Sequence, residues 1–258
     1  MGKIIAIINQ KGGVGKTTTA VNLSAMLAEM GQRVLVVDLD PQGNTTSGLG
    51  MAAGDKSVYE MLLGRVTLRE CAEATPWKNL SLAGADIRLA GAELDLVGME
   101  QREYRLRTAL KAESASYDFI FIDCPPSLGL LTVNALAAAD RVMIPIQCEY
   151  YALEGVTSLM NTISRVKRSI NPRLDIEGVV LTMLDGRTNL GLQVVDQVKK
   201  HFKKKVYATT IPRNVRLGEA PSHGEPIHIY DPRSTGALAY QALAQEVLEQ
   251  NGIKARRK

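Results

Sequence analysis

Aromatic residues, cysteines and long apolar runs are all scarce in this sequence. Only 5% of the 258 residues are aromatic. No run approaches the roughly 18 apolar residues of a membrane-spanning helix, and a strand-like run from Ile4 leaves no space for a secretory signal. The three cysteines, Cys71, Cys124 and Cys148, have neither metal-site nor redox spacing. These absences argue against a membrane-spanning or disulfide-stabilised protein and favour a reduced cytoplasm.

Positive charge is concentrated in two places, although the net charge of the chain is only +4. Five lysines fall within 199–205, and four basic residues fall within 254–258. Such clusters suit an anionic partner surface, either nucleic acid or lipid. They also suit a solvated helix face and a frayed tail, and the sequence leaves both interpretations open.

Short apolar runs alternate with segments of helical periodicity along the chain. Near-continuous Val, Ile and Leu runs are typical of strands buried on both faces, and their alternation with helices implies right-handed crossovers between parallel strands. We therefore predict one α/β domain over 1–258, with a twisted, mostly parallel sheet, helices on both faces and a basic tail over about 252–258. The irregular span 48–98 is predicted to form short helices beside the sheet. Strands are predicted at 4–8, 33–38, 79–84, 117–124, 141–148, 177–184 and 205–212, and helices at 16–30, 101–115, 129–139, 152–170, 189–202 and 235–250.

The stretch NQKGGVGKTT (9–18) lies between a predicted strand and a predicted helix. Its glycines let backbone N–H groups turn toward phosphate oxygens, and the following helix adds its positive N-terminal end. Lys16 is expected to reach the β- and γ-phosphates, and Thr17 to coordinate Mg²⁺. Two features depart from an ordinary P-loop. Gln10 stands where the pattern has its first glycine, which the sequence does not explain, and a second lysine, Lys11, follows it.

Polar residues follow other predicted strands at the same edge of the sheet, where ligands bind in doubly wound folds. In VVDLDPQGN, Asp38 and Asp40 either hold Mg²⁺, directly or through water, or orient the attacking water. Capping of the Asp-Pro-Gln-Gly turn is the alternative. In FIFIDCPPS, Asp123 ends an apolar strand as a Walker B acid does. In TIPRNVRL, Pro212 and Asn214 are placed to flank a purine base.

Taken together, these motifs resemble those of one family. KGGVGKTT, VLVVDLDPQGN, DCPPSLG, PIQCEYYALEG, LTMLDGRTNLG and IPRNVRLGEAPSHG are similar to motifs of the ParA/Soj chromosome-partitioning ATPases, in the deviant Walker A, or MinD-like, group. The resemblance covers roughly residues 2–250. It implies a P-loop NTPase fold that binds ATP or ADP with Mg²⁺ and hydrolyses ATP.

The resemblance also implies a role for each matching residue. Lys11 corresponds to the signature lysine that reaches the partner's phosphates across an ATP-dependent homodimer, and Asp40 to the acid required for hydrolysis. The implied catalytic set is Lys11, Lys16 and Asp40. The implied nucleotide-binding residues are Lys11, Gly12, Gly13, Val14, Gly15, Lys16, Thr17, Thr18, Met183, Pro212 and Asn214, and the implied metal-site residues are Thr17, Asp38 and Asp123.

DNA and a protein partner belong to the implied cycle. Arg187 and Arg216 correspond to arginines that bind double-stranded DNA without sequence preference once the ATP dimer forms. A ParB-type centromere-binding protein, through a short basic N-terminal segment, stimulates hydrolysis and so releases the DNA. The implied location is cytoplasmic, on the nucleoid when ATP is bound. No helix-turn-helix extension precedes Ile4, so we expect no autorepression by operator binding.

Two other members of the broader group are alternatives. A MinD-like membrane-associated positioning ATPase needs a membrane-seeking amphipathic C-terminal helix. The predicted last helix instead spaces Leu238, Leu243, Val247 and Leu248 for packing on the domain, so we expect no stable membrane association. An iron–sulphur reductase of the nitrogenase iron-protein type needs cluster cysteines at the dimer face. The cysteine beside the predicted Walker B acid has no second cysteine in a suitable position.

Overall fold

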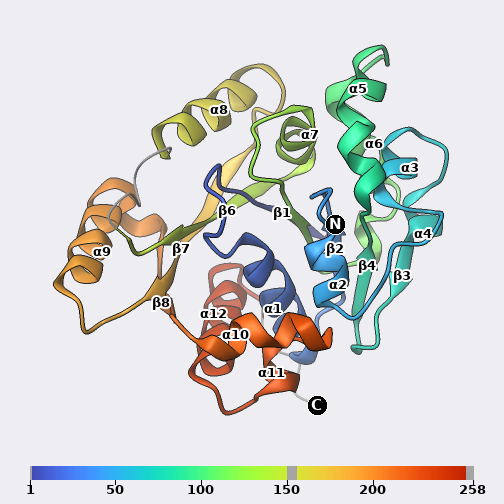
Figure 1. Ribbon diagram of the computed structural model, residues 1–258. Coiled ribbons are helices and arrows are strands. Elements are labelled where there is room, and N and C mark those ends of the chain that lie inside the picture. The colour runs from blue at the N-terminus through green and yellow to red at the C-terminus, as the bar shows by residue number, and fades with distance from the viewer. Residues whose placement is uncertain (1, 150–155, 254–258) are drawn as a thin grey trace.

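One eight-stranded sheet forms the centre of the molecule (Figure 1). This computed structural model describes residues 2–149 and 156–253. The strands lie in the order β3-β4-β2-β5-β1-β6-β7-β8. Neighbouring strands are parallel except β3 and β4. The bounds are β1 (Lys3–Ile7), β2 (Val34–Asp38), β3 (Ala72–Ala74), β4 (Leu80–Ala83), β5 (Phe119–Asp123), β6 (Arg141–Gln147), β7 (Asp175–Leu184) and β8 (Val206–Pro212).

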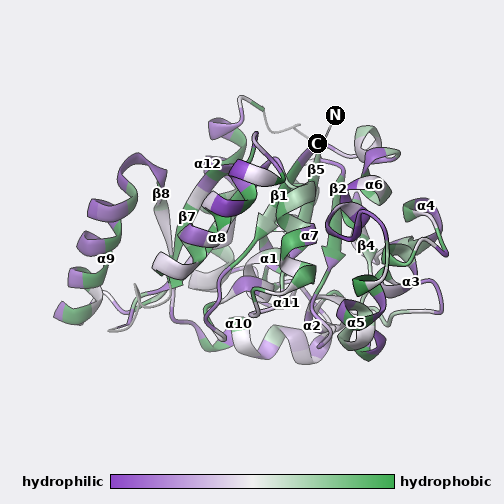
Figure 2. Cartoon of the chain, turned by 90° about the horizontal axis from the view of Figure 1, so that it is seen from above, coloured by the Kyte–Doolittle hydropathy of each residue, from purple (hydrophilic) through white to green (hydrophobic). Residues whose placement is uncertain are grey.

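Alternate side chains of the sheet enter two hydrophobic layers on its opposite faces. Along β1, Ile5 and Ile7 pack with residues of α1 and α12, whereas Ala6 packs with residues of α7 and α8. Strands β2 and β5 are buried along their whole length, because helices cover both sides of the sheet. Figure 2 shows hydrophobic residues along the central strands and hydrophilic residues over much of α9. The predicted α/β fold, with a mostly parallel sheet between helices, is confirmed.

Helices occupy most of the connections between parallel strands. Within 2–149 and 156–253, none of them is long and apolar enough to cross a membrane. A 3₁₀ helix, η1 (Ile87–Gly91), precedes α5. The α-helices are α1 (Lys16–Glu29), α2 (Asn44–Gly48), α3 (Val58–Leu62), α4 (Leu68–Cys71), α5 (Ala92–Val97), α6 (Arg105–Lys111), α7 (Leu130–Ala138), α8 (Val156–Ser169), α9 (Asn189–Phe202), α10 (Val215–Glu219), α11 (Ile227–Tyr230) and α12 (Thr235–Gln250).

The structure departs from the sequence-based prediction at short elements. The antiparallel edge strand β3 was not predicted, because three residues are too few to show a period. The predicted helix over 101–115 is α-helical only in α6, with a 3₁₀ turn on either side. Helices α10 and α11 were also missed, and Leu238 of α12 is exposed rather than packed on the domain. The predicted helix start at 152–155 and the tail residues 254–258 lie outside the described residues.

Candidate nucleotide-binding site

The loop between β1 and α1 presents an open helix N-terminus. Gly13 and Gly15 have φ values of 73° and 89°, in the left-handed region that side chains disfavour. Within the described residues, no side chain caps α1 and no acidic residue lies in its first turn. Its first N–H groups are therefore free to bind an anion, and the helix dipole favours negative charge there.

The structure explains why glycine is not needed at position 10. Among the described non-glycine residues, only Asn79, Gln101, Met183 and Lys203 have positive φ, so Gln10 lies in ordinary backbone space with its side chain exposed. The start of the loop is held by the residue before it. Buried Asn9 donates from Nδ2 to the Pro145 carbonyl (2.7 Å) and accepts from the Lys11 N–H (3.0 Å). Asn9 anchors the loop to β6, a role that sequence reasoning missed.

The two lysines of the loop lie in different environments. Lys16 is buried, and its Nζ donates to the Lys11 carbonyl at 3.4 Å. Burial lowers the pKa of Lys16, although attraction to Asp123 and Asp40 opposes that shift. The Lys11 side chain is only partly buried, and no carboxylate in the described part of the chain forms an ion pair with it. Lys16 thus points into its own loop, whereas Lys11 remains available to another group.

Two carboxylates lie side by side on neighbouring strands beneath the loop. Asp38 on β2 is in register with Asp123 on β5, and neither is exposed to solvent. Asp123 Oδ2 accepts from the hydroxyls of Thr17 and Thr45, both at 2.8 Å. Asp38 Oδ2 accepts from the N–H (2.9 Å) and the hydroxyl (2.7 Å) of Thr46. Burial raises the pKa of both carboxyls, and the nearby Asp38 raises that of Asp123 further.

Sequence reasoning missed the threonines of α2. They directly follow VVDLDPQGN, so hydroxyls placed just after an acidic strand end were the available signal. Thr45 donates to Asp123 and Thr46 donates to Asp38. These hydrogen bonds supply the partners that buried carboxylates require, and they hold α2 against the carboxyl ends of β2 and β5. Movement of α2 would therefore disturb both acids.

The donor set near the loop fits a magnesium ion. Thr17 and Asp123 supply hard oxygen atoms, and Asp123 Oδ1 is buried without a hydrogen-bond partner among the described residues. No group of three or more His, Cys, Asp or Glu within 2–149 and 156–253 could hold a metal. Mg²⁺ in proteins is usually held by one or two carboxylates together with water and substrate phosphates, and Asp123 offers one such carboxylate. Asp38 is less available as a metal ligand than Asp123, because both of its oxygens accept hydrogen bonds: Oδ2 from Thr46, and Oδ1 from the Asp40 N–H at 3.2 Å.

Asp40 takes part in the turn after β2. Its Oδ1 accepts from the Gln42 N–H (3.0 Å), and its carbonyl accepts from the Gly43 N–H (2.9 Å). The turn-capping interpretation is therefore correct for one carboxylate oxygen. In the described residues no hydrogen bond occupies Oδ2, so the same side chain retains an acceptor for water.

A cavity of about 480 Å³ lies beside the loop and includes the residues predicted to contact the base. Met183 has a φ of 52°, a strained value for a side chain of its size, and such strain is frequent at binding sites. Asn214 Nδ2 donates to Thr235 Oγ1 at 2.7 Å, and Asn214 Oδ1 is buried with no hydrogen-bond partner in the described part of the chain. The lining includes Gly15, Thr18, Met183, Pro212, Arg213 and Asn214.

The two arginines predicted to bind DNA lie outside this cavity and pair with carboxylates. Arg187, exposed in the loop before α9, lies 2.8 Å from Asp185. Arg216 on α10 lies 2.8 Å from Glu219 and 3.5 Å from Asp231. Exposed pairs of this kind contribute little stability, on the order of 0–1 kcal/mol. A phosphate can therefore replace the carboxylate at little cost.

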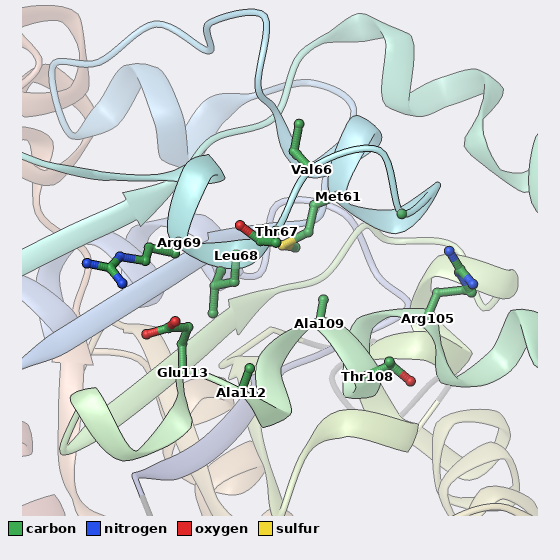
Figure 3. Close-up of a pocket in the computed structure, with 11 residues that line it drawn as sticks. Met61, Val66, Thr67, Leu68, Arg69, Arg105, Thr108, Ala109, Ala112 and Glu113 are labelled. Atoms are coloured by element: carbon green, nitrogen blue, oxygen red, sulfur yellow. The ribbon is translucent and has the colours of Figure 1, made fainter.

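A second cavity, of about 370 Å³, lies between the α3–α4 segment and α6 (Figure 3). Met61 and Leu68 contribute buried apolar side chains, and Arg69, Arg105 and Glu113 contribute charged ones. It shares no lining residue with the phosphate loop or with the cavity beside it. The cavity next to the loop, in contrast, is lined by Gly15 and Thr18 of the loop itself.

Comparisons with known proteins agree with this geometry. A family model described as an AAA domain matches residues 2–176. The chain is 61% identical over 249 residues to the sporulation initiation inhibitor protein Soj of Bacillus subtilis, covering 96% of this chain and 98% of that protein. It is 52% identical over 260 residues to the chromosome partitioning protein ParA of Myxococcus xanthus, covering 100% of this chain and 92% of that protein. A solved structure, cobyrinic acid a,c-diamide synthase from Mycobacterium smegmatis with bound ATP analog and magnesium, has a TM-score of 0.86 and 39% identity, covering 98% of this chain and 96% of that chain.

Proposed function

The chain belongs to the ParA/Soj family of chromosome-partitioning ATPases, and from this membership we propose a specific cycle. ATP binding at the loop forms a homodimer that holds double-stranded DNA without sequence preference. Hydrolysis to ADP and phosphate, stimulated by a ParB-type partner, separates the dimer and releases the DNA. The single observation that carries the ATPase site is the contact of Thr17 with Asp123 below an open helix N-terminus.

Phosphate binding is assigned to the backbone of 11–18 together with Lys16. The left-handed glycines turn N–H groups inward, and the buried lysine places one positive charge where the triphosphate would lie. The solved relative from Mycobacterium smegmatis is described with an ATP analog and magnesium. We extend that pair of ligands to this chain, because the loop and its oxygen donors are present.

Magnesium would be held by Thr17 and Asp123, with Asp38 supporting the loop that carries Asp40. When bound, it would neutralise charge on the phosphate oxygens during transfer. Asp40, with one oxygen left for a water molecule, orients that water for attack on the γ-phosphorus. A bond forms between the water oxygen and the γ-phosphorus while the bond from that phosphorus to the bridging oxygen breaks. ADP departs with the electron pair, and Asp40 Oδ2 accepts the proton that the water loses.

The base is assigned to the cavity lined by Met183, Pro212 and Asn214. The exocyclic amino group of adenine is a hydrogen-bond donor, and the buried Asn214 Oδ1 is an acceptor that lacks a partner among the described residues. A ligand that supplies this donor removes the cost of an unsatisfied buried acceptor, about 1–3 kcal/mol.

Lys11 is assigned to the second subunit. Lys16 already serves the loop of its own chain, and Lys11 has no carboxylate partner within the described residues. If Lys11 contacts the γ-phosphate of the nucleotide bound to a second copy, that contact holds the two copies together for as long as the γ-phosphate is present. Hydrolysis would then loosen the pair.

DNA binding is assigned to Arg187 and Arg216, and a dimer would present each of them twice. Paired weak sites gain from effective concentration, and their affinity for phosphates falls steeply with salt. We place the protein in the cytoplasm, on the nucleoid when ATP is bound. The MinD-like alternative is not favoured, because the apolar residues Leu243, Val247 and Leu248 of α12 are buried against the domain.

Gel filtration of an Asp40→Ala variant tests the proposal most directly. With ATP and Mg²⁺ the variant should elute as a dimer, and added duplex DNA should elute with the dimer fraction. Liposomes in place of DNA are the control for a membrane function. A variant that stays monomeric with ATP, or a dimer that ignores DNA, would contradict the cycle.

A further inference from the structure

The segment formed by η1 and α5 is apolar on two sides. Leu89, Ala92 and Leu96 are buried in the core. A second set of apolar residues, Ile87, Ala90, Leu94 and Val97, is exposed. Among them the large side chains of Ile87, Leu94 and Val97 are 71%, 81% and 57% exposed. An element whose first apolar side already packs on the domain has a second side left for a partner.

The exposed apolar residues follow helical spacing. They are separated by three, four and three positions from Ile87 to Val97. Three residues make one turn of the 3₁₀ helix η1, and residues three and four apart share one side of an α-helix. The spacing is that of a stripe into which the apolar side of another helix can pack. Figure 1 shows α5 at the periphery of the molecule, where such a partner would have access.

The charge around this stripe is mostly negative. Residues 89–101 contain Glu93, Asp95 and Glu100 and no lysine or arginine. Within the described residues, none of these three carboxylates forms an ion pair. The adjacent arginines already form ion pairs: Arg88 pairs with Asp86 and Glu60, and Arg102 pairs with Glu103. Asp95 Oδ2 accepts from the Tyr59 hydroxyl (2.9 Å) and Glu93 Oε1 from the Leu131 N–H (3.2 Å), but neither hydrogen bond neutralises the negative charge. A partner that carries positive charge would therefore complement this side of the molecule.

We propose that the η1–α5 stripe is the docking surface for a basic amphipathic segment of the ParB-type partner. The inference rests on the proposed function, because it assigns a place to the partner of that cycle. A second copy of this chain is the less favoured occupant. Near the axis of a twofold dimer the stripe would meet itself and set carboxylates against carboxylates.

A short chain of contacts links the stripe to the nucleotide site. Glu93 Oε1 accepts from the Leu131 N–H at 3.2 Å, at the start of α7. A side chain at position 129 would overlap Glu93, so the loop that leads from Asp123 into α7 packs directly on α5. A segment bound on α5 would therefore be connected through Glu93 to the loop that begins at Asp123. This contact chain gives the partner a route to the hydrolytic site.

The test measures partner binding and stimulated ATP hydrolysis separately, using the ParB-type protein of the same organism as the probe. Leu94→Lys adds charge at an exposed position and should leave folding, unstimulated hydrolysis and the ATP dimer unchanged. The partner concentration for half-maximal stimulation should rise at least ~10-fold, which corresponds to ~1.4 kcal/mol. Glu100→Lys should raise it ~3-fold at low salt, and less at high salt. Leu192→Lys, at an exposed leucine of α9, is the matched control and should behave as wild type.

Three other outcomes would overturn the docking surface, and one would overturn only the partner step of the proposed function. Equal partner binding by wild type and Leu94→Lys, or no binding by wild type even at low salt, would overturn the docking surface. Loss of the ATP dimer in Leu94→Lys would assign the stripe to a second copy and also overturn it. Wild-type binding that Leu94→Lys abolishes, without any stimulation of hydrolysis, would support the docking surface and overturn the partner step of the proposed function.

Discussion

The hydroxyl of Thr17 donates a 2.8 Å hydrogen bond to Oδ2 of Asp123, joining the first turn of α1 to the end of β5. These residues lie 106 positions apart in the sequence. Their contact brings the end of the phosphate loop together with the acid of the neighbouring strand. It also brings together the two oxygen donors that we propose for magnesium.

Thr17→Ala should raise the Mg²⁺ concentration for half-maximal ATP hydrolysis at least ~10-fold, because it removes an oxygen donor while leaving the loop in place. Thr17→Ser keeps the hydroxyl and should remain within ~3-fold of wild type. The measurement is phosphate release during a magnesium titration, with nucleotide held constant. An unchanged magnesium requirement in Thr17→Ala would remove Thr17 from the metal site.

Lys16→Ala and Lys11→Ala should fail at different steps. Lys16→Ala loses the buried charge of the loop, so a fluorescent ATP analogue should bind at least ~100-fold more weakly. Lys11→Ala should bind the analogue normally but remain a monomer in gel filtration. ATP-dependent dimerisation that persists in Lys16→Ala would contradict the assignment of that lysine.

Asp40→Ala should bind ATP and dimerise, yet lose at least ~100-fold in turnover, because the water is no longer oriented. Asp40→Asn is the companion variant, since its amide oxygen can still accept from the Gln42 N–H and hold the turn. Single-turnover hydrolysis distinguishes chemistry from product release. Normal turnover in both variants would show that another group orients the water.

Arg187→Glu should weaken binding to duplex DNA ~10-fold or more and flatten its dependence on salt, because a phosphate contact is lost. Stability should barely change, since Arg187 is 90% exposed. Arg165→Glu, an exposed change of the same charge on α8, is the matched control. Equal loss of affinity in the two variants would indicate a general charge effect rather than a contact at Arg187.

Gly178→Ala should lower the free energy of unfolding by about 1–3 kcal/mol, because a Cβ there would overlap the buried ring of Tyr207. Gly186→Ala meets no atom within 4 Å and should change stability by less than about 0.5 kcal/mol. Denaturant titration compares the two variants directly. Equal stability of both variants would show that β7 and β8 separate easily at that point.

Sequence patterns predicted the elements that repeat a period or carry a motif. The buried strands, α1 and the P-loop came from apolar runs and from glycine spacing, which are local properties of the chain. The acids Asp38 and Asp123 came from their place at strand ends. Short elements such as β3 and α11 had no period to detect, and the exposure of Leu238 depended on how α12 sits against the sheet.

The sequence by itself determined the chemistry of this protein: a glycine loop with two lysines, acids after buried strands and a family whose motifs these are. Only the tertiary structure decided which side chains meet. Asn9 reaches Pro145, Thr45 reaches Asp123, and Gln10 needs no glycine because its backbone does not enter the left-handed region. The physical reason is that strand order and helix packing, rather than distance along the chain, bring these atoms within hydrogen-bond reach.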